Sequence, residues 1–394
     1  MNRAPIIMLV AGEPSGDLIA ADLVRAMRAD PRLQAGDFAP RFFGVGGPRL
    51  AAEGVDLAFD LTRHAVVGLV EVVRKLASFR RLLHQLVDLA CLRRPDVVVC
   101  VDFGGFNLRF AEALRRRLER EHGVFQNWRP RLVQYVSPQV WASRPGRAVG
   151  MAHNLDLLLC ILPFEPAWYA LRAPRLRVEF VGHPILDRHD LPDTTPGIAR
   201  TAVGPTEVLL LPGSRVGELR RHLPVMIDAA RQIAAQRPIT FPVVLPDERL
   251  LALARSLGLD SLPGAAPQVG GLTQALARAT LAIASTGTVT LECALFGVPT
   301  VALYKTSAVT YAIARRLATV PYLAMPNLLA NEPVFPEFIQ GAATGANLAR
   351  AALELLGDPV RAATVRGQLA KIVAQLGGPG ASRRAASAIA GLLL

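Results

Sequence analysis

Cysteine is scarce in this sequence, with four residues among 394, and no two of them form a CxxC pair. Three of the four lie in apolar stretches with the pattern of strands or helices, as expected for reduced core thiols. This usage disfavours a zinc site or a disulfide framework and is typical of a cytosolic protein. The four residues are Cys91, Cys100, Cys160 and Cys293.

Long apolar runs are also missing, and none approaches the length of a transmembrane helix. The stretch 6–10 is too short for the apolar region of a signal peptide and leads directly into Gly12 and Glu13, so we expect a buried strand there. Charged residues make up only 19% of the chain, whereas 51% of the residues are hydrophobic. A chain of this length and composition can bury a large core and is expected to form two domains.

Aromatic residues make up only 6% of the chain, and the sequence contains no zinc-finger spacing and no aromatic-rich RNP-type strand. Few side chains can therefore stack on bases, which disfavours nucleic acid as a partner. The formal net charge is nevertheless +12. We expect an anionic partner, such as a membrane surface or a phosphorylated substrate. Part of the charge lies on helical faces, as at 115–117, where the arginines could simply be solvated.

Short apolar runs alternate with amphipathic helical segments along the chain, which predicts mostly parallel sheets covered on both faces. We expect an α/β fold of two Rossmann-like domains, 1–185 and 186–345, with a cleft between them, followed by a helical region at 346–394. In such sheets, ligands bind at the carboxyl ends of the strands. The predicted strands are 6–10, 41–45, 97–101, 131–135, 157–161 and 179–181, then 208–211, 241–245, 281–284 and 300–304.

Two loops of the first half carry carboxylates just after a predicted strand. Gly12, Glu13, Ser15, Gly16 and Asp17 follow the strand 6–10 and open a helix, where Asp17 could be only a helix-capping or first-turn acid. Asp102 follows the strand 97–101 and is itself followed by two glycines and Asn107. A carboxylate in that position could act as a general base if it faces the cleft, or it could only form a turn.

Two loops of the second half have the pattern of phosphate-binding loops. Gly213, Ser214 and Arg215 join the strand 208–211 to a long helix, and Thr286, Gly287 and Thr288 join the strand 281–284 to another. Free amide groups at helix N-termini attract phosphate, and an arginine adds a bidentate donor. Glu292 could hold a ribose, while an ordinary strand-to-helix turn is the alternative interpretation.

The sequence has no Walker lysine motif and no GxGxxG, which disfavours an ATPase and a dehydrogenase. We also find no Asp-x-Asp pair to hold Mg²⁺ on a diphosphate. Neutralisation of a diphosphate would then depend on Arg215, Lys305 and the helix dipoles.

The segment 65–86 is both apolar and basic. Such a helix could lie in an anionic membrane surface or line an acyl-chain groove, or it could be a core helix with snorkelling basic ends. The residues expected to contact membrane or acyl chains are Val66, Val67, Leu69, Val70, Val73, Leu76 and Phe79.

Eight motifs, taken together and in order, resemble the lipid-A-disaccharide synthase family over nearly the whole chain. They are Ala11-Gly-Glu-Pro-Ser-Gly-Asp17, Gly44-Val-Gly-Gly-Pro48, Val136-Ser-Pro-Gln-Val-Trp-Ala142, Leu162-Pro-Phe-Glu165, Val181-Gly-His-Pro184, Leu211-Pro-Gly-Ser-Arg215, Gly287-Thr288 with Leu291-Glu292, and Pro326-Asn-Leu-Leu-Ala330.

The resemblance implies a GT-B glycosyltransferase that works by inversion and without a metal or other cofactor. Such an enzyme joins UDP-2,3-diacylglucosamine to 2,3-diacylglucosamine 1-phosphate. The products are a β(1→6) disaccharide and UDP. It also implies peripheral association with the cytoplasmic face of the inner membrane, as a monomer or homodimer, and C-terminal helices that pack back on the first domain or on a partner subunit.

For the site, the resemblance makes Asp102 the expected base, with Asp17 and Glu13 in reserve, and Arg215 the group that stabilises the departing UDP. The residues expected to contact the substrates are Gly12, Ser15, Gly16, Ser137, Trp141, Gly213, Ser214, Glu218, Thr286, Gly287, Thr288, Glu292, Lys305 and Asn327.

Two departures from the family pattern bear on turnover and acyl preference. Gly104 and Gly105 stand where the family more often has proline and a second aspartate, and Ser143 replaces an expected tryptophan. Two other functions stay open. One is a different UDP-sugar enzyme of the same architecture, such as an epimerase, and the other is a non-catalytic lipid- or nucleotide-binding protein.

Overall fold

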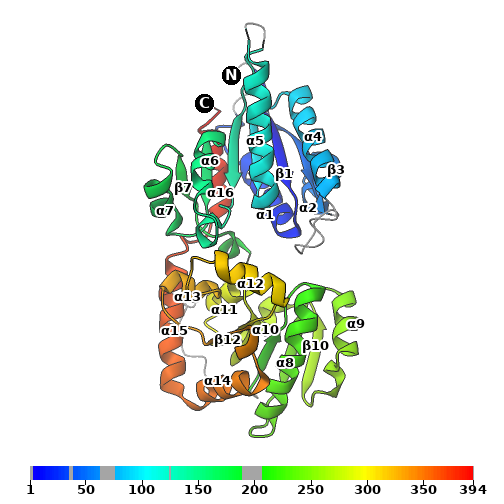
Figure 1. Cartoon of the computed structure of the whole chain (residues 1–394), viewed down its shortest axis with the longest axis vertical. Coiled ribbons are helices and arrows are strands. Elements are labelled where there is room, and N and C mark those ends of the chain that lie inside the picture. The colour runs from blue at the N-terminus through cyan, green and yellow to red at the C-terminus, as the bar shows by residue number, and fades with distance from the viewer. Residues whose placement is uncertain (1–2, 35–38, 63–75, 124–125, 189–205, 394) are drawn as a thin grey trace. The chain divides into compact units, whose positions relative to one another are not determined.

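The computed structural model describes residues 3–34, 39–62, 76–123, 126–188 and 206–393. Contacts divide the chain into two compact units, of which the first comprises 1–188 with 376–394 and the second comprises 189–375. Each unit is built around one parallel β-sheet with helices packed on it (Figure 1).

The sheet of the first unit has seven strands in the order β3-β2-β1-β4-β5-β6-β7. The central strand β1 pairs with β2 on one side and with β4 on the other, so that Ile7 lies between Phe42 and Val97. The strand order therefore reverses between β1 and β4. The strands are β1 (Ile6–Ala11), β2 (Arg41–Gly46), β3 (Asp56–Asp60), β4 (Val97–Val101), β5 (Arg131–Tyr135), β6 (Leu157–Cys160) and β7 (Val178–Phe180).

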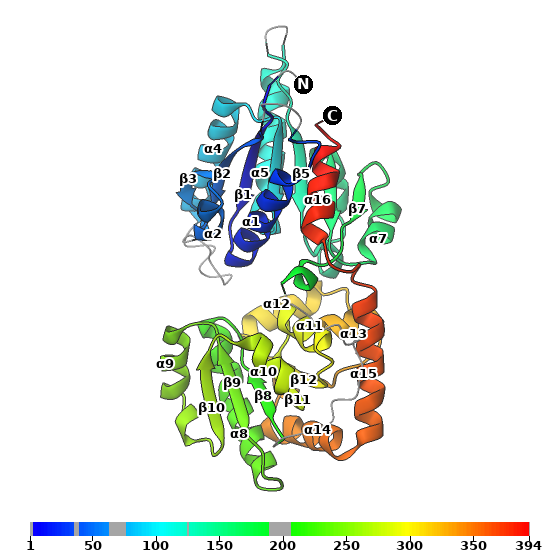
Figure 2. The same cartoon turned by 180° about the vertical axis from the view of Figure 1, so that it is seen from behind.

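Helices cover both faces of this sheet. Because alternate residues of a strand point to opposite sides of the sheet, each central strand contributes to both cores. Ile7 and Leu9 of β1 pack in one core with α1 and α16, whereas Met8 and Val10 pack in the other with α4, α5, α6 and α7 (Figures 1 and 2). The helices are α1 (Pro14–Arg28), α2 (Pro48–Ala52), α4 (Leu76–Arg93), α5 (Gly104–Glu121), α6 (Arg147–Asn154), α7 (Glu165–Arg172) and α16 (Ala381–Ala390), with short 3-10 helices η2 (Val140–Ala142) and η3 (Pro184–Asp187).

The sheet of the second unit has six strands in the order β10-β9-β8-β11-β12-β13, with the reversal between β8 and β11. They are β8 (Val208–Leu211), β9 (Phe241–Leu245), β10 (Ala265–Val269), β11 (Leu281–Ser285), β12 (Thr300–Tyr304) and β13 (Glu337–Ile339). The helices are α8 (Val216–Ala234), α9 (Glu248–Ser256), α10 (Leu272–Arg278), α11 (Thr288–Leu295), α12 (Ala308–Leu317), α13 (Met325–Ala330), α14 (Gly345–Gly357) and α15 (Pro359–Ala374), with 3-10 helices η4 (Leu259–Ser261) and η5 (Gln340–Ala342).

The predicted α/β architecture of two Rossmann-like sheets is confirmed, but three strands were not predicted. These are β3, β10 and β13, which all lie at sheet edges. Their residues are only partly buried or exposed, so they carry no apolar run that the sequence could reveal. A central strand such as β4 is buried throughout and was therefore found.

The C-terminal helices do not all leave the second unit, which corrects the boundary predicted at residue 346. Helix α14 packs against α8, β11 and β12, and α15 packs against α11 and α13. Only the segment from 376 belongs to the first unit, where α16 contacts α1 and η3. Ala385 and Ile389 of α16 are buried in the core beside the first sheet.

Within the described ranges, the structure has no helix that is both long enough and apolar enough to span a membrane.

Candidate functional site

The predicted base and the first-strand loop meet at the switch point of the first sheet. Because β1 and β4 are parallel neighbours, the loops that follow them leave the same edge of the sheet. The Ser15 hydroxyl donates a hydrogen bond to Oδ2 of Asp102 over 3.0 Å. The carboxylate of Asp102 is only partly buried, so it is accessible for chemistry.

The backbone at Asp102 is held in an unusual conformation. Asp102 and Phe103 have φ angles of 52° and 45°, in the left-handed region that non-glycine residues seldom adopt. Such residues cost about 1–3 kcal/mol each and persist only where the surroundings enforce them. Strained residues of this kind cluster at functional sites, so the conformation supports Asp102 as a functional residue.

Two buried amides enforce this conformation. Nδ2 of Asn107 and Nε2 of Gln134 donate to the carbonyl oxygen of Asp102 over 2.9 and 3.0 Å, and the Asp102 N–H donates to the Tyr135 carbonyl over 2.8 Å. Both amide side chains are fully buried. Neither was predicted as a site residue, although a glutamine inside the otherwise apolar strand β5 is a signal that the sequence does carry.

Glycines at 12 and 16 allow the loops to pack closely around Asp102. A Cβ atom on Gly12 would lie 2.2 Å from Cδ1 of Phe103, and one on Gly16 would lie 3.2 Å from Cβ of Asp102. Gly104 is enclosed in the same way, since its Cβ would lie 2.6 Å from Cβ of Pro138, whereas Gly105 faces open space. The glycine at 104, a departure from the family pattern, is therefore required by this packing.

Asp17 does not have the geometry of a reserve base. Its carboxylate is almost completely buried and accepts backbone N–H groups from Gly47, Arg49 and Leu50 at 2.7, 2.9 and 3.2 Å. It thereby caps the N-terminus of α2. Glu13 precedes α1 and is partly buried, and its carbonyl accepts the Asp17 N–H over 2.8 Å.

Ser137 and Trp141 belong to a buried polar cluster rather than to an open substrate surface. Nε1 of Trp141 donates to Oε1 of Glu165 over 3.0 Å, and Oε2 of Glu165 accepts the Leu162 N–H over 3.0 Å. The hydroxyls of Ser137 and Tyr169 lie 3.0 Å apart. Burial raises the pKa of Glu165 to about 7. Glu165 was not predicted as a site residue, and the only sequence signal for it is its place in a family motif.

In the second unit, the two predicted phosphate loops lie side by side. The strands β8 and β11 are parallel neighbours, and each is followed by a short loop and a helix N-terminus, at α8 and α11. Ser214, Arg215, Gly287 and Thr288 are all exposed at this edge. Two helix N-termini with adjacent loops and an exposed arginine form an arrangement suited to a diphosphate.

Glu218 occupies part of this arrangement itself. Its Oε2 accepts the Ser214 N–H over 3.2 Å, and its Oε1 accepts Nη1 of Arg215 over 3.3 Å. Gly213 has a φ of +117°, and a Cβ there would lie 2.7 Å from Oε2 of Glu218. The carboxylate of Glu218 therefore holds the loop in shape from within, which differs from the substrate contact that was predicted for it.

Lys305 was expected to neutralise phosphate, but its ammonium group is engaged elsewhere. Its Nζ donates to the carbonyls of Gln340 and Ala343 over 3.0 and 3.1 Å. The buried imidazole of His222 instead links the end of β12 to the predicted phosphate loop after β8. Its Nδ1 donates to the Pro212 carbonyl over 2.9 Å, and its Nε2 accepts the Lys305 N–H over 3.0 Å. Burial lowers the pKa of His222, which favours this neutral form. No sequence pattern singles out His222.

The remaining predicted residues of this unit differ in accessibility. Thr286, in the loop before α11, and Glu292, in the middle of α11, are both partly buried. Asn327 is fully buried, and its Oδ1 accepts the Phe335 N–H over 2.7 Å while Nδ2 donates to the Phe335 carbonyl over 2.9 Å. Asn327 therefore braces a loop instead of pointing toward a ligand, which corrects the predicted substrate contact.

The predicted membrane-contact residues Val66, Val67, Leu69, Val70 and Val73 lie outside the described residues. Leu76 is the first residue of α4. The ring of Phe79 is partly buried, with its centroid 6.5 Å from that of Phe103 and 6.0 Å from that of Phe106. Phe79 thus packs beside the Asp102 loop, and its expected membrane or acyl contact stays a prediction.

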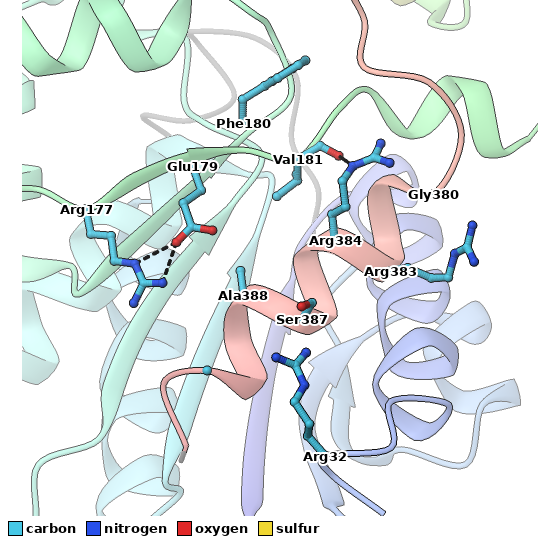
Figure 3. Close-up of a pocket in the computed structure, with 11 residues that line it drawn as sticks. Arg32, Arg177, Glu179, Phe180, Val181, Gly380, Arg383, Arg384, Ser387 and Ala388 are labelled. Atoms are coloured by element: carbon cyan, nitrogen blue, oxygen red, sulfur yellow. Dashed lines mark hydrogen bonds and ion pairs between the residues drawn. The ribbon is translucent and has the colours of Figure 1, made fainter.

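A surface pocket of about 630 Å³ in the first unit lies between β7, α16 and Arg32 (Figure 3). Arg384 of α16 anchors the C-terminal helix in this pocket. Arg384 donates to the carbonyls of Val181, Pro379 and Gly378, and Arg177 pairs with Glu179. None of the predicted site residues lines this pocket.

Among the described residues, no group of three or more His, Cys, Asp or Glu side chains could hold a metal ion.

Residues 7–391 match the family model of lipid-A-disaccharide synthetase. The chain is similar to lipid-A-disaccharide synthase of Syntrophus aciditrophicus, at 38% identity over 98% of this chain and 97% of that protein, and to that of Myxococcus xanthus, at 37% over 100% and 99%. Among solved structures, it shares its fold with the UDP-GlcNAc 2-epimerase of Neisseria meningitidis bound to UDP-GlcNAc, with a TM-score of 0.63, 10% identity and coverage of 98% and 99%. A glycotransferase of kitacinnamycin gives a TM-score of 0.62 at 18% identity, with both chains fully covered.

Proposed function

Because the chain belongs to the lipid-A-disaccharide synthetase family, we propose that it transfers 2,3-diacylglucosamine from UDP to the 6-hydroxyl of 2,3-diacylglucosamine 1-phosphate. The products are a β(1→6) disaccharide 1-phosphate and UDP. The observation that carries the proposal is the pair of helix N-termini at the switch point of the second sheet, with Arg215 as the N-cap of α8. The UDP-GlcNAc bound to the epimerase of the same fold supports a UDP-sugar as the ligand.

The second unit binds the donor through its diphosphate. Backbone N–H groups at the starts of α8 and α11 donate to the phosphate oxygens, and the guanidinium of Arg215 turns from Glu218 to the diphosphate. These donors, rather than a metal ion, stabilise the negative charge that grows on UDP as the glycosidic bond breaks. Glu292 holds the ribose.

Asp102 in the first unit acts as the general base. Ser15 holds Oδ2, and the amides of Asn107 and Gln134 fix the backbone. In this proposal the other carboxylate oxygen accepts the proton of the acceptor hydroxyl. Asp102 removes the proton as that hydroxyl oxygen attacks the anomeric carbon. The bond from this carbon to the UDP oxygen breaks on the opposite side, which inverts the configuration. Glu13 remains the reserve for this role.

We further propose that the enzyme associates peripherally with the anionic cytoplasmic face of the inner membrane. It does so as a monomer or homodimer. The net charge of +12 supports attraction to acidic lipid. Both substrates carry acyl chains, so a membrane is where the enzyme would meet them.

The central test follows UDP release from the acylated donor, with and without the acceptor and with and without EDTA. Release that needs the acceptor and survives EDTA is expected. C2 epimerisation of the donor would indicate an epimerase, and UDP release without the acceptor would indicate hydrolysis in place of transfer. Loss of activity in EDTA would contradict the metal-free mechanism.

The role of Asp102 is tested with Asp102→Asn, which keeps the size of the side chain. Loss of a general base lowers the rate by about 10²–10⁴-fold, while donor affinity should stay unchanged. Asp260→Asn, at an exposed carboxylate in the other unit, is the control. Unchanged turnover in Asp102→Asn would move the base to another residue, with Glu13 next to be tested.

A further inference from the structure

Helix α12 in the second unit is unusual because none of its ten residues is buried. It begins four residues after β12 ends, and the Ser307 hydroxyl caps it by accepting the Thr310 N–H over 3.2 Å. Its sequence is amphipathic, like that of α8, but α8 buries an apolar face that includes Leu219, Leu223 and Met226. Among the described residues of the second unit, none covers the apolar face of α12 in this way.

That face forms one continuous stripe. Val309, Ile313 and Leu317 follow one another at intervals of four residues, so they lie on the same side of the helix. They are 71%, 40% and 41% exposed. At about 1.5 Å of rise per residue, the stripe is about 12 Å long. Leu323, just beyond the helix, is also exposed.

The stripe starts next to the two phosphate loops of the same unit. Strand β12 pairs with β11, and the Thr286 N–H donates to the Leu303 carbonyl over 3.1 Å. His222 joins the Pro212 carbonyl to the backbone of Lys305, which lies two residues before Ser307, the cap of α12. A ligand with its diphosphate at these loops therefore has exposed apolar surface directly beside it.

We propose that α12 binds the fatty acyl chains of the nucleotide-linked donor, along Val309, Ile313 and Leu317. This inference rests on the proposed function, because it takes the donor to be an acylated UDP-sugar. Apolar chains gain affinity by covering an apolar surface, by a factor of about four for each buried methylene. Arg315 and Arg316 in the last turn can cover the chains with their stems while their charges remain in water.

The test compares the affinities of the acylated donor and of UDP, measured by titration calorimetry, for the full chain and for Val309→Ser/Ile313→Ser. We expect the double variant to bind the acylated donor at least about tenfold more weakly and to bind UDP as before. Lengthening the acyl chains should increase the affinity of the wild type more than that of the variant. Val360→Ser is the matched control, since Val360 lies in the same unit and is 76% exposed.

The outcomes separate the two proposals. Failure of the wild type to bind UDP contradicts the proposed function. Normal UDP binding with equal donor affinity in wild type and double variant overturns the role of α12. An equal loss of donor affinity in Val360→Ser also overturns the role of α12. If the double variant instead loses only binding to phosphatidylglycerol vesicles, or changes its oligomeric state, the stripe serves a membrane or a second copy and the acyl proposal is wrong.

Discussion

Replacing Glu165 by glutamine is expected to change how the stability of the first unit depends on pH. The carboxyl group is almost completely buried, and its pKa rises from 4.5 to about 7 because burial disfavours the charged form. In the unfolded chain the pKa returns to its ordinary value. Between these two values the folded protein therefore binds more protons than the unfolded protein.

The sign and size follow from this difference. The stabilising contribution of Glu165 is complete below about pH 4.5, decreases as the pH rises, and is lost once the pH exceeds about 7. At about 1.4 kcal/mol for each pH unit, the loss over this interval is about 3 kcal/mol. Glutamine does not titrate, and it alters the bonds to Trp141 and Leu162 by an amount that does not depend on pH.

Tryptophan fluorescence during urea unfolding is a suitable measurement, because all three tryptophans, Trp128, Trp141 and Trp168, belong to the first unit. The free energy of unfolding of wild type minus that of Glu165→Gln should fall by about 3 kcal/mol between about pH 4.5 and pH 7.5. The difference removes other titrations common to both proteins.

His183 is one such titration. Its pKa is lowered to about 3 by burial, so it makes the folded state more stable as pH rises toward 6.5, opposite to Glu165. Glu119→Gln, at an exposed glutamate of the same unit, is the control and should show no comparable trend. A difference that stays constant across this pH range would refute the reasoning.

Three further changes test the first-unit site. Gly12→Ala places a Cβ 2.2 Å from the ring of Phe103 and should cost about 1–3 kcal/mol of stability and lower kcat, and a variant with wild-type stability and kcat would show that the ring moves freely. Asp17→Ala removes the acceptor of three backbone N–H groups and should lower the free energy of unfolding by about 3 kcal/mol without abolishing turnover, whereas complete inactivity of the folded variant would restore a catalytic role. Gln134→Leu releases the carbonyl of Asp102 and should lower kcat with little change in KM, and an unaltered kcat would show that Asn107 suffices to hold it.

Much of the fold was predictable because the central strands are buried on both faces. The runs at β1, β4, β8 and β11 are almost wholly apolar, so their pattern is visible without a structure. Edge strands such as β13 lack this pattern, since one side of each meets solvent or a loop. The side-by-side placement of the two predicted phosphate loops was also predictable, because each stands between a buried strand and a helix.

The sequence by itself determined the two-sheet architecture, the loops at the strand ends and the candidacy of Asp102 and Arg215. These features are local, because an apolar run and the polar residues that follow it are adjacent in the chain. Only the tertiary structure decided how the candidates differ. It engages Asp17, Asn327 and Lys305 with backbone groups of other segments, and it leaves Asp102 accessible on a strained turn. Burial and hydrogen-bond partners depend on residues far apart in sequence, so no local pattern could show which polar side chains remain available for a substrate.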